Sequence, residues 1–279
     1  MLEQDVMPAG PYRLPTAGRD GVLVRRDGAL VRALQLGDES AVVRAWAAGG
    51  RVRLRAEAPS GEVAAAAIER MRFALGTDHD LAEFYRRFSR DALIGPVIRR
   101  RPWLRPRRRP EPFEALAWAV CEQLIDSRRA AAIERSIVSR LGGRSACGGF
   151  RIPPTAGRVA ACAPAELDAC GLAPKRSIAL IKAAREVASG RADLSEHEPS
   201  WRRLLAISNI GNWTIEMLAF EGQGRDDMIP ALDLAYVILV GRLEHGGRHA
   251  TEEEVRGFFA PYGEYAALAG IYALHRRFL

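Results

Sequence analysis

The stretch from Leu204 to Leu243 constrains the fold of this chain more than any other. An apolar pattern of helical spacing, for which Ser200 is a favourable N-cap, is interrupted at Ser208–Gly211. Asn209 and the glycine tolerate left-handed backbone angles, so we expect a tight turn there. Apolar residues at helical spacing resume after Asn212. The stretch therefore predicts two short helices joined by a hairpin.

The predicted hairpin has the features of an anion-binding site. The first N–H groups of a helix have no partner within the helix, and they point out of its end. A glycine such as Gly211 lets a large anion approach these groups closely, so the hairpin can hold a phosphate without a charged side chain. An ordinary helix–helix corner has the same sequence pattern, and both interpretations stay open.

The same stretch places an aspartate at a predicted helix start. A polar segment, 221–227, is followed by Ile229–Asp233 and then by an almost wholly apolar segment, 234–240. Asp233 stands at the N-cap, where such a side chain contributes about 1 kcal/mol to stability. A helix N-terminus also favours an ionised carboxylate, so Asp233 can be a cap, a catalytic group or both.

Together these residues resemble the helix-hairpin-helix DNA glycosylases, in particular their alkylbase branch. That family has a Leu-Pro-Gly-Ile-Gly-like hairpin, then Trp-Thr in the alkylbase branch, and about twenty residues later a proline followed closely by the catalytic aspartate. Here Ile207–Gly211, Trp213–Thr214 and Pro230–Asp233 occupy those places. A Ser-Asn pair at 208–209 replaces the usual Pro-Gly, and asparagine still permits the turn.

The first eighty residues are patterned as strands followed by a helix. Gly49-Gly50 is a predicted hairpin turn. After it, apolar residues alternate with Arg51, Arg53 and Arg55, which gives one buried face and one basic face that we expect to face water. The segment Gly61–Leu75 carries an apolar helical stripe that can pack on the sheet.

The resemblance and these patterns imply a fold that is α+β and mainly α. A small N-terminal α+β domain, residues 1–80, would precede a two-lobed, all-helical helix-hairpin-helix glycosylase domain, residues 81–279. One lobe of this domain would comprise roughly residues 111–226, and the other would comprise residues 81–110 together with 227–279.

A helix predicted to begin at Pro112 leads to the segment Glu122–Ile125. This segment resembles the family's Gly-Gln-x-Ile or Gly-Gln-x-Val, which enters the DNA minor groove beside the lesion. The resemblance makes Leu124 the wedge that fills the gap left by an extruded base. Leu124 also continues the apolar stripe of the helix, so a place in the core is the alternative.

Basic residues are concentrated in one segment. The net charge of +7 equals the number of arginines between 99 and 109, where no acid occurs. Prolines at 102, 106 and 110 forbid regular structure there. The segment fits a solvated linker, and it also fits a set of phosphate contacts in which Arg107, Arg108 and Arg109 contribute to salt-dependent DNA binding.

Composition excludes several other classes of protein. No apolar run approaches the ~20 residues of a membrane span, and the first residues lack a signal pattern. We therefore expect no membrane contact and a cytoplasmic, bacterial-type, nucleoid-associated location. The four cysteines are spaced too irregularly for a zinc site or a disulfide framework, so no metal site is expected.

The resemblance implies a DNA N-glycosylase, a hydrolase of the DNA-3-methyladenine glycosylase II type. It would flip an alkylated purine out of the duplex and hydrolyse the N-glycosidic bond, leaving an abasic site for base excision repair. An ionised Asp233 would stabilise the positive charge that develops on the sugar. Relatives that also cut the strand have a lysine two residues after the hairpin's last glycine, where this chain has Trp213, so we expect a monofunctional enzyme.

The family's positions carry over to three sets of residues. The catalytic residue is Asp233. The base pocket would comprise Trp213, Met217, Leu234, Tyr236, Ile271 and Tyr272, with Met217, Leu234 and Ile271 standing where family members often have aromatic residues. The DNA-binding residues would be Gln123, Leu124, Ile207, Asn209, Ile210, Gly211 and Thr214.

The resemblance also implies partners and cofactors. We expect a monomer that binds double-stranded DNA containing a damaged base. No cofactor is required for the chemistry, although hairpin carbonyls in this family can hold a monovalent cation.

Two further functions stay open beside the alkylated-base glycosylase. A glycosylase for oxidised or deaminated bases would use the same hairpin and aspartate with a different pocket. In a non-catalytic helix-hairpin-helix DNA-binding protein, Asp233 would be a helix cap only.

Overall fold

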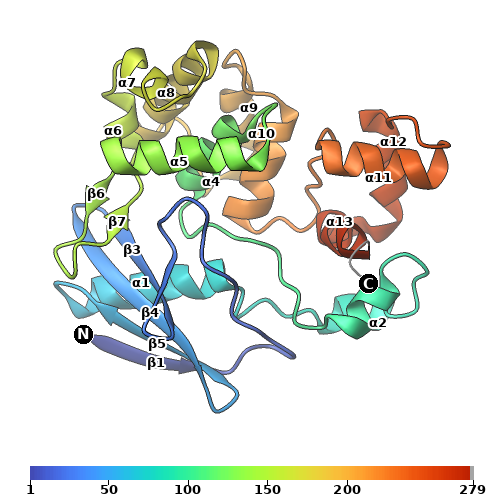
Figure 1. Cartoon of the computed structure of the whole chain (residues 1–279), viewed down its shortest axis with the longest axis horizontal. Coiled ribbons are helices and arrows are strands. Elements are labelled where there is room, and N and C mark those ends of the chain that lie inside the picture. Colours follow the sequence, from blue (N-terminus) through green and yellow to red (C-terminus); the bar gives the residue numbers. More distant parts are fainter. Residues whose placement is uncertain (277–279) are drawn as a thin grey trace.

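Five antiparallel strands near the N-terminus form the main sheet, in the order β1-β5-β4-β3-β2 (Figure 1). The computed structural model describes residues 1–276, and the strands are β1 Leu2–Val6, β2 Val24–Arg26, β3 Ala29–Leu36, β4 Glu39–Ala48 and β5 Arg51–Glu57. Helix α1, Gly61–Leu75, packs against the sheet, and apolar side chains from both form one core cluster. The predicted order of strands followed by a helix is confirmed.

The turn at Gly49-Gly50 joins β4 to β5. Both glycines have positive φ, 56° and 79°, which a two-residue hairpin loop of this kind requires. Val52 and Leu54 then lie in the core, whereas Arg53 on the opposite face pairs with Asp5 of β1. The predicted alternation of buried and basic faces is therefore confirmed.

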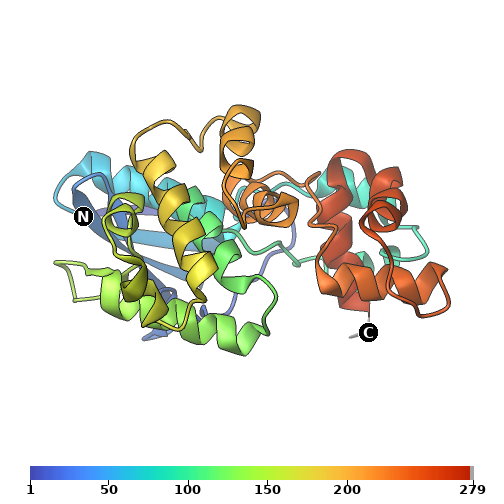
Figure 2. The ribbon, with the colours of Figure 1, turned by 90° about the horizontal axis from the view of Figure 1, so that it is seen from above.

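Two groups of helices complete the described chain, and they lie side by side (Figures 1 and 2). The group nearer the sheet comprises α4 Pro112–Glu122, α5 Ser127–Leu141, α6 Ala156–Ala160, α7 Pro164–Asp168, α8 Pro174–Ala188, α9 His197–Leu205, α10 Asn212–Met217 and the π-helical turn η1 Leu218–Gly222. The other comprises α2 Ala82–Phe88, α3 Gly95–Arg100, α11 Leu234–Glu244, α12 Glu252–Phe259, the 3-10 helix η2 Ala260–Tyr265 and α13 Ala266–His275. Two short strands, β6 Gly143–Arg144 and β7 Arg151–Ile152, pair between α5 and α6.

The second group is built from two distant parts of the chain. Its apolar cluster joins Phe84 and Ile94 with residues such as Phe259 and Tyr272. The chain therefore leaves this group after α3, forms the other group and returns at α11. The boundaries proposed for the domains and their lobes stay a prediction.

Helix starts were predicted with mixed success. Helix α4 begins at Pro112 as expected, because proline needs no N–H partner in the first turn. Helix α9 begins at His197, so the predicted N-cap at Ser200 is wrong. Pro199 fits the first turn of a helix and lets α9 start earlier, while the Ser200 hydroxyl donates a hydrogen bond to the Asp193 carbonyl.

Among residues 1–276, no helix combines the length and the apolar character that crossing a membrane would require.

Candidate active site and DNA interface

The hairpin between α9 and α10 has the predicted tight turn. The Ile210 N–H donates to the Ile207 carbonyl at 3.0 Å, and Asn209 between them has φ of 68°. Ile207 and Ile210 are buried, whereas Asn209 and the N-cap Gly211 are exposed. The apolar residues anchor the turn, and its polar tip remains open to a ligand.

Gln123 ties this hairpin to the turn between α4 and α5. Its Nε2 donates to the Asn209 carbonyl and to the Thr214 hydroxyl, both at 2.9 Å. The Arg176 side chain of α8 donates to the carbonyls of Cys121 and Gln123, at 3.2 and 2.8 Å. The structure thus brings the predicted DNA-binding residues of two distant segments together.

Leu124 lies at the tip of the α4–α5 turn. It has a positive φ of 53°, and its relative exposure is 104%. Left-handed backbone costs a residue with a side chain roughly 1–2 kcal/mol. The alternative that Leu124 belongs to the core is therefore wrong, because the turn ends the helical stripe and directs the side chain into solvent.

Asp233 is the N-cap of α11. Its Oδ1 accepts a hydrogen bond from the Ala235 N–H at 2.8 Å, and its Oδ2 accepts one from Trp213 Nε1 at a longer 3.4 Å. The predicted cap is confirmed, and the carboxylate also contacts the helix that follows the hairpin. The catalytic role of Asp233 stays a prediction that this geometry permits.

A further acid near Asp233 was missed by sequence reasoning. Glu216 of α10 is 3% exposed; its Oε2 accepts from the Ala231 N–H at 3.2 Å and its Oε1 pairs with Arg256. Burial raises the pKa of Glu216, against the hydrogen bond from Arg256. The available signal was a glutamate between the apolar residues Ile215 and Met217 of a predicted helix.

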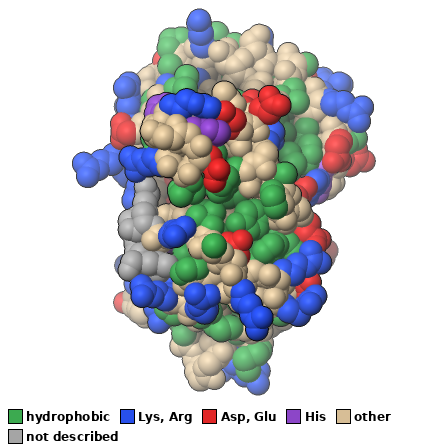
Figure 3. Space-filling model, turned by 90° about the vertical axis from the view of Figure 1, so that its right-hand side faces the viewer, with side chains coloured by type: hydrophobic (Ala, Val, Ile, Leu, Met, Phe, Trp, Pro, Cys, Tyr) green, Lys and Arg blue, Asp and Glu red, His purple; other side chains and the backbone are tan. Residues whose placement is uncertain are grey.

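Four of the residues predicted for the base pocket are at least partly accessible. Leu234, beside Asp233, is 60% exposed, and Trp213, Met217 and Ile271 are partly buried. Leu232 on the other side of Asp233 is 51% exposed. The residues on either side of Asp233 are therefore exposed and apolar, and the Trp213 indole ring contacts its carboxylate. The face formed by the C-terminal helices shows apolar side chains across its middle and a band of basic side chains below them (Figure 3).

Tyr236 and Tyr272 do not line an accessible surface, and this corrects their expected place in the pocket. Tyr236 is 3% exposed and packs on α13 at Gly270, where any side chain would meet its hydroxyl at 3.0 Å. Tyr272 is fully buried, and its hydroxyl donates to the Leu104 carbonyl at 3.0 Å and contacts the Tyr85 hydroxyl at the same distance. Tyr236 thus packs α11 against α13, and Tyr272 holds α13 against the segment at Leu104.

The arginine segment is neither a solvated linker nor an open phosphate site at Arg108 and Arg109. The Arg109 side chain contacts Asp20 at 2.6 Å and Glu114 at 3.2 Å, and Arg108 pairs with Asp226. The Arg109 pairs are buried, and Arg108 is buried against a partly buried Asp226. Sequence spacing could not reveal them, because the partners lie up to 118 residues away.

Electrostatics keeps the Arg109 cluster charged. Burial acts to lower the pKa of Arg109, but the carboxylates of Glu114, Glu221 and Asp20 outweigh it and raise that pKa. Asp20 shows the reverse balance: burial acts to raise its pKa, but Arg109, Arg32 and the hydrogen bond from the Val22 N–H together outweigh burial and lower that pKa. Arg109 and the carboxylates around it therefore keep one another ionised in the buried cluster.

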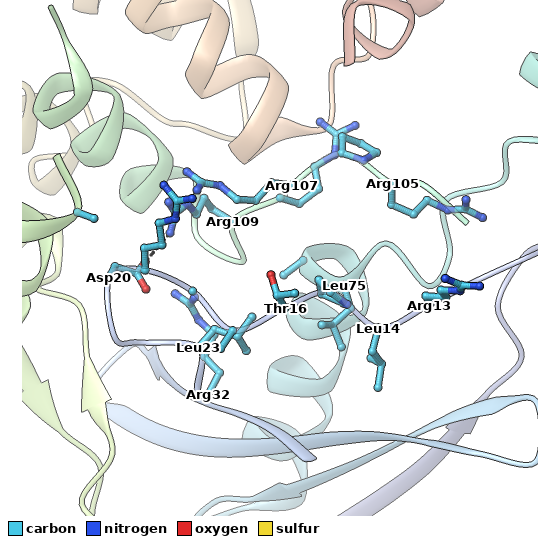
Figure 4. Close-up of a pocket in the computed structure, with 18 of the residues that line it drawn as sticks. Arg13, Leu14, Thr16, Asp20, Leu23, Arg32, Leu75, Arg105, Arg107 and Arg109 are labelled. Atoms are coloured by element: carbon cyan, nitrogen blue, oxygen red, sulfur yellow. Dashed lines mark hydrogen bonds and ion pairs between the residues drawn. The ribbon is translucent and has the colours of Figure 1, made fainter. Parts of the chain in front are cut away.

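A cavity of about 600 Å³ lies beside this cluster (Figure 4). Asp20, Arg32 and Arg109 converge at one end, and Arg13 and Arg105 lie at the other. Neither Asp233 nor Trp213 contributes to its lining. The cavity is thus separate from the candidate site.

Metal ligands are not gathered anywhere in residues 1–276: no group of three or more His, Cys, Asp or Glu side chains there could hold an ion. The monovalent cation suggested for the hairpin carbonyls stays a prediction.

Comparisons with known proteins agree with this geometry. No model of a protein family matches the chain. The DNA-3-methyladenine glycosylase of Bacillus subtilis is 26% identical over 202 residues, 70% of this chain and 67% of that protein. DNA-3-methyladenine glycosylase 1 of Schizosaccharomyces pombe is 33% identical over 131 residues, 45% of this chain and 54% of that protein. The chain thus matches about half the length of the second relative.

Solved structures share the fold. The 3-methyladenine DNA glycosylase of Archaeoglobus fulgidus has a TM-score of 0.82 at 22% identity, covering 100% of this chain and 99% of its own. The Schizosaccharomyces pombe enzyme in complex with abasic DNA has a TM-score of 0.57 at 25% identity, covering 68% and 93%. An 8-oxoguanine glycosylase/lyase of Clostridium acetobutylicum has a TM-score of 0.71 at 14% identity, covering 93% and 88%. The chain has the fold of the helix-hairpin-helix DNA glycosylases, and the sequence similarities support an alkylbase glycosylase of this superfamily.

Proposed function

We propose that this protein is a monofunctional DNA glycosylase that excises alkylated purines and leaves an abasic site. The observation that carries the proposal is the meeting of the Asp233 carboxylate with Trp213, next to a hairpin that Gln123 ties to the exposed Leu124. The relatives named DNA-3-methyladenine glycosylase support the choice of alkylated bases. The partner is double-stranded DNA, and the protein acts as a monomer of the DNA-3-methyladenine glycosylase II type.

DNA binding comes first in the proposed mechanism. The open tip of the hairpin, at Asn209 and Gly211, grips a backbone phosphate through main-chain N–H groups. Leu124 enters the stack and holds the gap open while the damaged nucleotide rotates out, a step that costs a few kcal/mol. Gln123 keeps the hairpin and the α4–α5 turn at a fixed distance, so the hairpin binds the backbone next to the same lesion at which Leu124 enters the stack.

Bond cleavage follows at Asp233. The sugar acquires positive charge as the base departs, and a carboxylate fixed at the start of α11 stabilises that charge. It also orients the attacking water. Trp213 stands where a lysine would be needed for strand cleavage, so the product is an abasic site. No cofactor takes part in these steps.

Substrate selection falls to a pocket with few aromatic rings. An electron-rich ring attracts a cationic alkylpurine, and Trp213 is the accessible ring among the proposed pocket residues. Leu234, Met217 and Ile271 offer apolar contact without that attraction. We therefore expect a narrower range of alkylated bases than a pocket of stacked aromatics would accept.

The test is base release from duplexes that each carry one defined lesion, followed by chromatography. The lesions are 3-methyladenine, 7-methylguanine, hypoxanthine and 8-oxoguanine. We expect release of at least one methylpurine, with an intact strand until the abasic site is cut by alkali. Release of hypoxanthine or 8-oxoguanine alone would contradict the proposed substrate, and release of none would contradict the proposed activity.

A further inference from the structure

Glu216 is a buried carboxylate to which the proposed mechanism gives no role. It lies three residues after Trp213 in α10, so the two side chains share one face of the helix. Trp213 reaches the Asp233 carboxylate, and Glu216 reaches the backbone at Ala231, two residues earlier. One face of α10 therefore contacts the segment before α11 at two points.

The segment before α11 packs into the apolar core at Ile229 and Ala231, and its backbone also donates a hydrogen bond to the Glu216 side chain. Ala231 is fully buried, and its N–H donates to Glu216 Oε2 at 3.2 Å. The Asp233 N–H donates to the Pro230 carbonyl at 2.8 Å, which closes a turn around Ala231. A change at the Ala231 hydrogen bond is thus transmitted through one turn to the backbone of Asp233.

Stability alone does not explain an acid at position 216. Removing a carboxylate from water costs several kcal/mol, and apolar replacements of buried ion pairs are often neutral or stabilising. Arg256, the ion-pair partner, also pairs with Glu252 at 2.7 Å and is 42% exposed in its side chain. A methionine at 216 would fill the space without the cost of burying a charge.

We propose that Glu216 is a positioning residue that holds Asp233 in its reactive place by accepting the Ala231 hydrogen bond. This inference rests on the proposed function and deepens it. Glu216 touches neither base nor sugar in this account; it acts through the turn and, with Trp213, fixes the carboxylate relative to the hairpin that grips DNA.

Three variants separate this role from ion pairing. Glu216→Met keeps the volume and removes the acceptor, whereas Glu216→Gln keeps an acceptor for Ala231 and removes the charge. Arg256→Gln breaks the ion pair and leaves the Ala231 bond. Each full-length protein is first checked for cooperative thermal unfolding.

Two readouts are measured on the folded variants. The first is the single-turnover rate of methylpurine release, with the dissociation constant for lesion DNA measured separately. The second is the NMR signal of the Trp213 indole N–H and its hydrogen exchange, which report the bond to Asp233 whether or not the protein is active. Trp213→Phe assigns that signal among the five tryptophans.

We expect Glu216→Met to slow release by up to about 100-fold with little change in DNA affinity, since a misplacement near 1 Å has that effect. Its Trp213 signal should shift and exchange faster, while Glu216→Gln and Arg256→Gln stay near wild type in both readouts. If the wild type releases no base but the Trp213 signal responds as described, the proposed function fails and the positioning role stands. An unchanged Trp213 signal in Glu216→Met, or equal effects of Met and Gln, would overturn the proposal.

Discussion

Leu124 and Arg109 occupy opposite environments, and each environment is energetically unfavourable for that type of side chain. Leu124, an apolar side chain, is fully exposed on left-handed backbone, whereas Arg109, a permanent charge, is 6% exposed. Burying a leucine normally gains about 1.5–3 kcal/mol, and burying a charge is tolerated only when it is paired. The cost of burying the Arg109 charge is offset by three carboxylates. Within the described residues, no contact offsets the cost of exposing Leu124.

The difference separates a side chain that is free to contact a partner, Leu124, from a set of ion pairs that stabilise the fold, those of Arg109. An exposed apolar side chain that folding leaves without contacts is available for a partner such as a stack of bases. Arg108 and Arg109 are buried and paired with carboxylates, so their charges are not presented to a phosphate at the surface. The exposed Leu124 is therefore a better candidate for contact with a partner than the buried Arg108 and Arg109 are.

The largest effect that the comparison predicts is on stability. Arg109→Met leaves Asp20 buried without its ion-pair partner and leaves Glu114 paired with Arg32 alone, which should lower the free energy of unfolding by about 3–5 kcal/mol. Urea unfolding measures this. Arg107→Met is the matched control, because the Arg107 side chain is 54% exposed and its ion pairs should contribute less than about 1 kcal/mol. Equal losses in the two variants would contradict the claim that the buried pairs of Arg109 stabilise the fold more than the exposed pairs of Arg107 do.

A smaller effect is expected at Leu124, and on activity only. Leu124→Ala should slow base release from duplex DNA by about tenfold, because the shorter side chain fills the gap less well. Thermal unfolding should be unchanged. Leu243→Ala, at another exposed leucine at the end of α11, is the control and should affect neither. A loss of stability without a loss of activity in Leu124→Ala would show that Leu124 holds the fold.

The smallest effect concerns an acid that borders the arginine cluster. Burial, and then the charge of Glu122, raise the pKa of Glu134 to about 8, against the attraction of Arg109 and Arg107; Asp20 acts in the same direction as Glu122. The folded protein therefore keeps a proton that the unfolded chain releases at lower pH, so this group costs stability as pH rises from about 5 to about 8. Glu134→Gln should remove that cost.

Thermal unfolding between pH 5 and 8.5 tests the effect at Glu134. The variant should match wild type at pH 5 and be more stable by on the order of 1–2 kcal/mol, a few degrees, at pH 8.5. Parallel curves for the two proteins would show that Glu134 is charged in the fold at neutral pH.

Local chemistry made much of the fold and site predictable. Asparagine at 209 predicted left-handed backbone, the observed φ is 68°, and Asp233 predicted a cap that the structure contains. Gly49-Gly50 and the alternation after it predicted a hairpin with one buried face. Each of these depends on residues within one turn or one strand.

Long-range contacts were not predictable in the same way. The burial of Arg108 and Arg109 depends on acids from several distant segments, and Tyr272 is held by the linker at Leu104. The exposure of Leu124 depends on how one turn leaves α4. Helical spacing alone assigned that leucine equally well to the core.

The most direct test of the central claim compares Asp233→Asn with wild type in single-turnover base release. Asparagine also caps helices, so folding and DNA affinity should stay close to wild type while the rate falls by about 100- to 1,000-fold. A rate within a few-fold of wild type, from a variant that folds and binds DNA normally, would contradict the account and leave Asp233 as a helix cap.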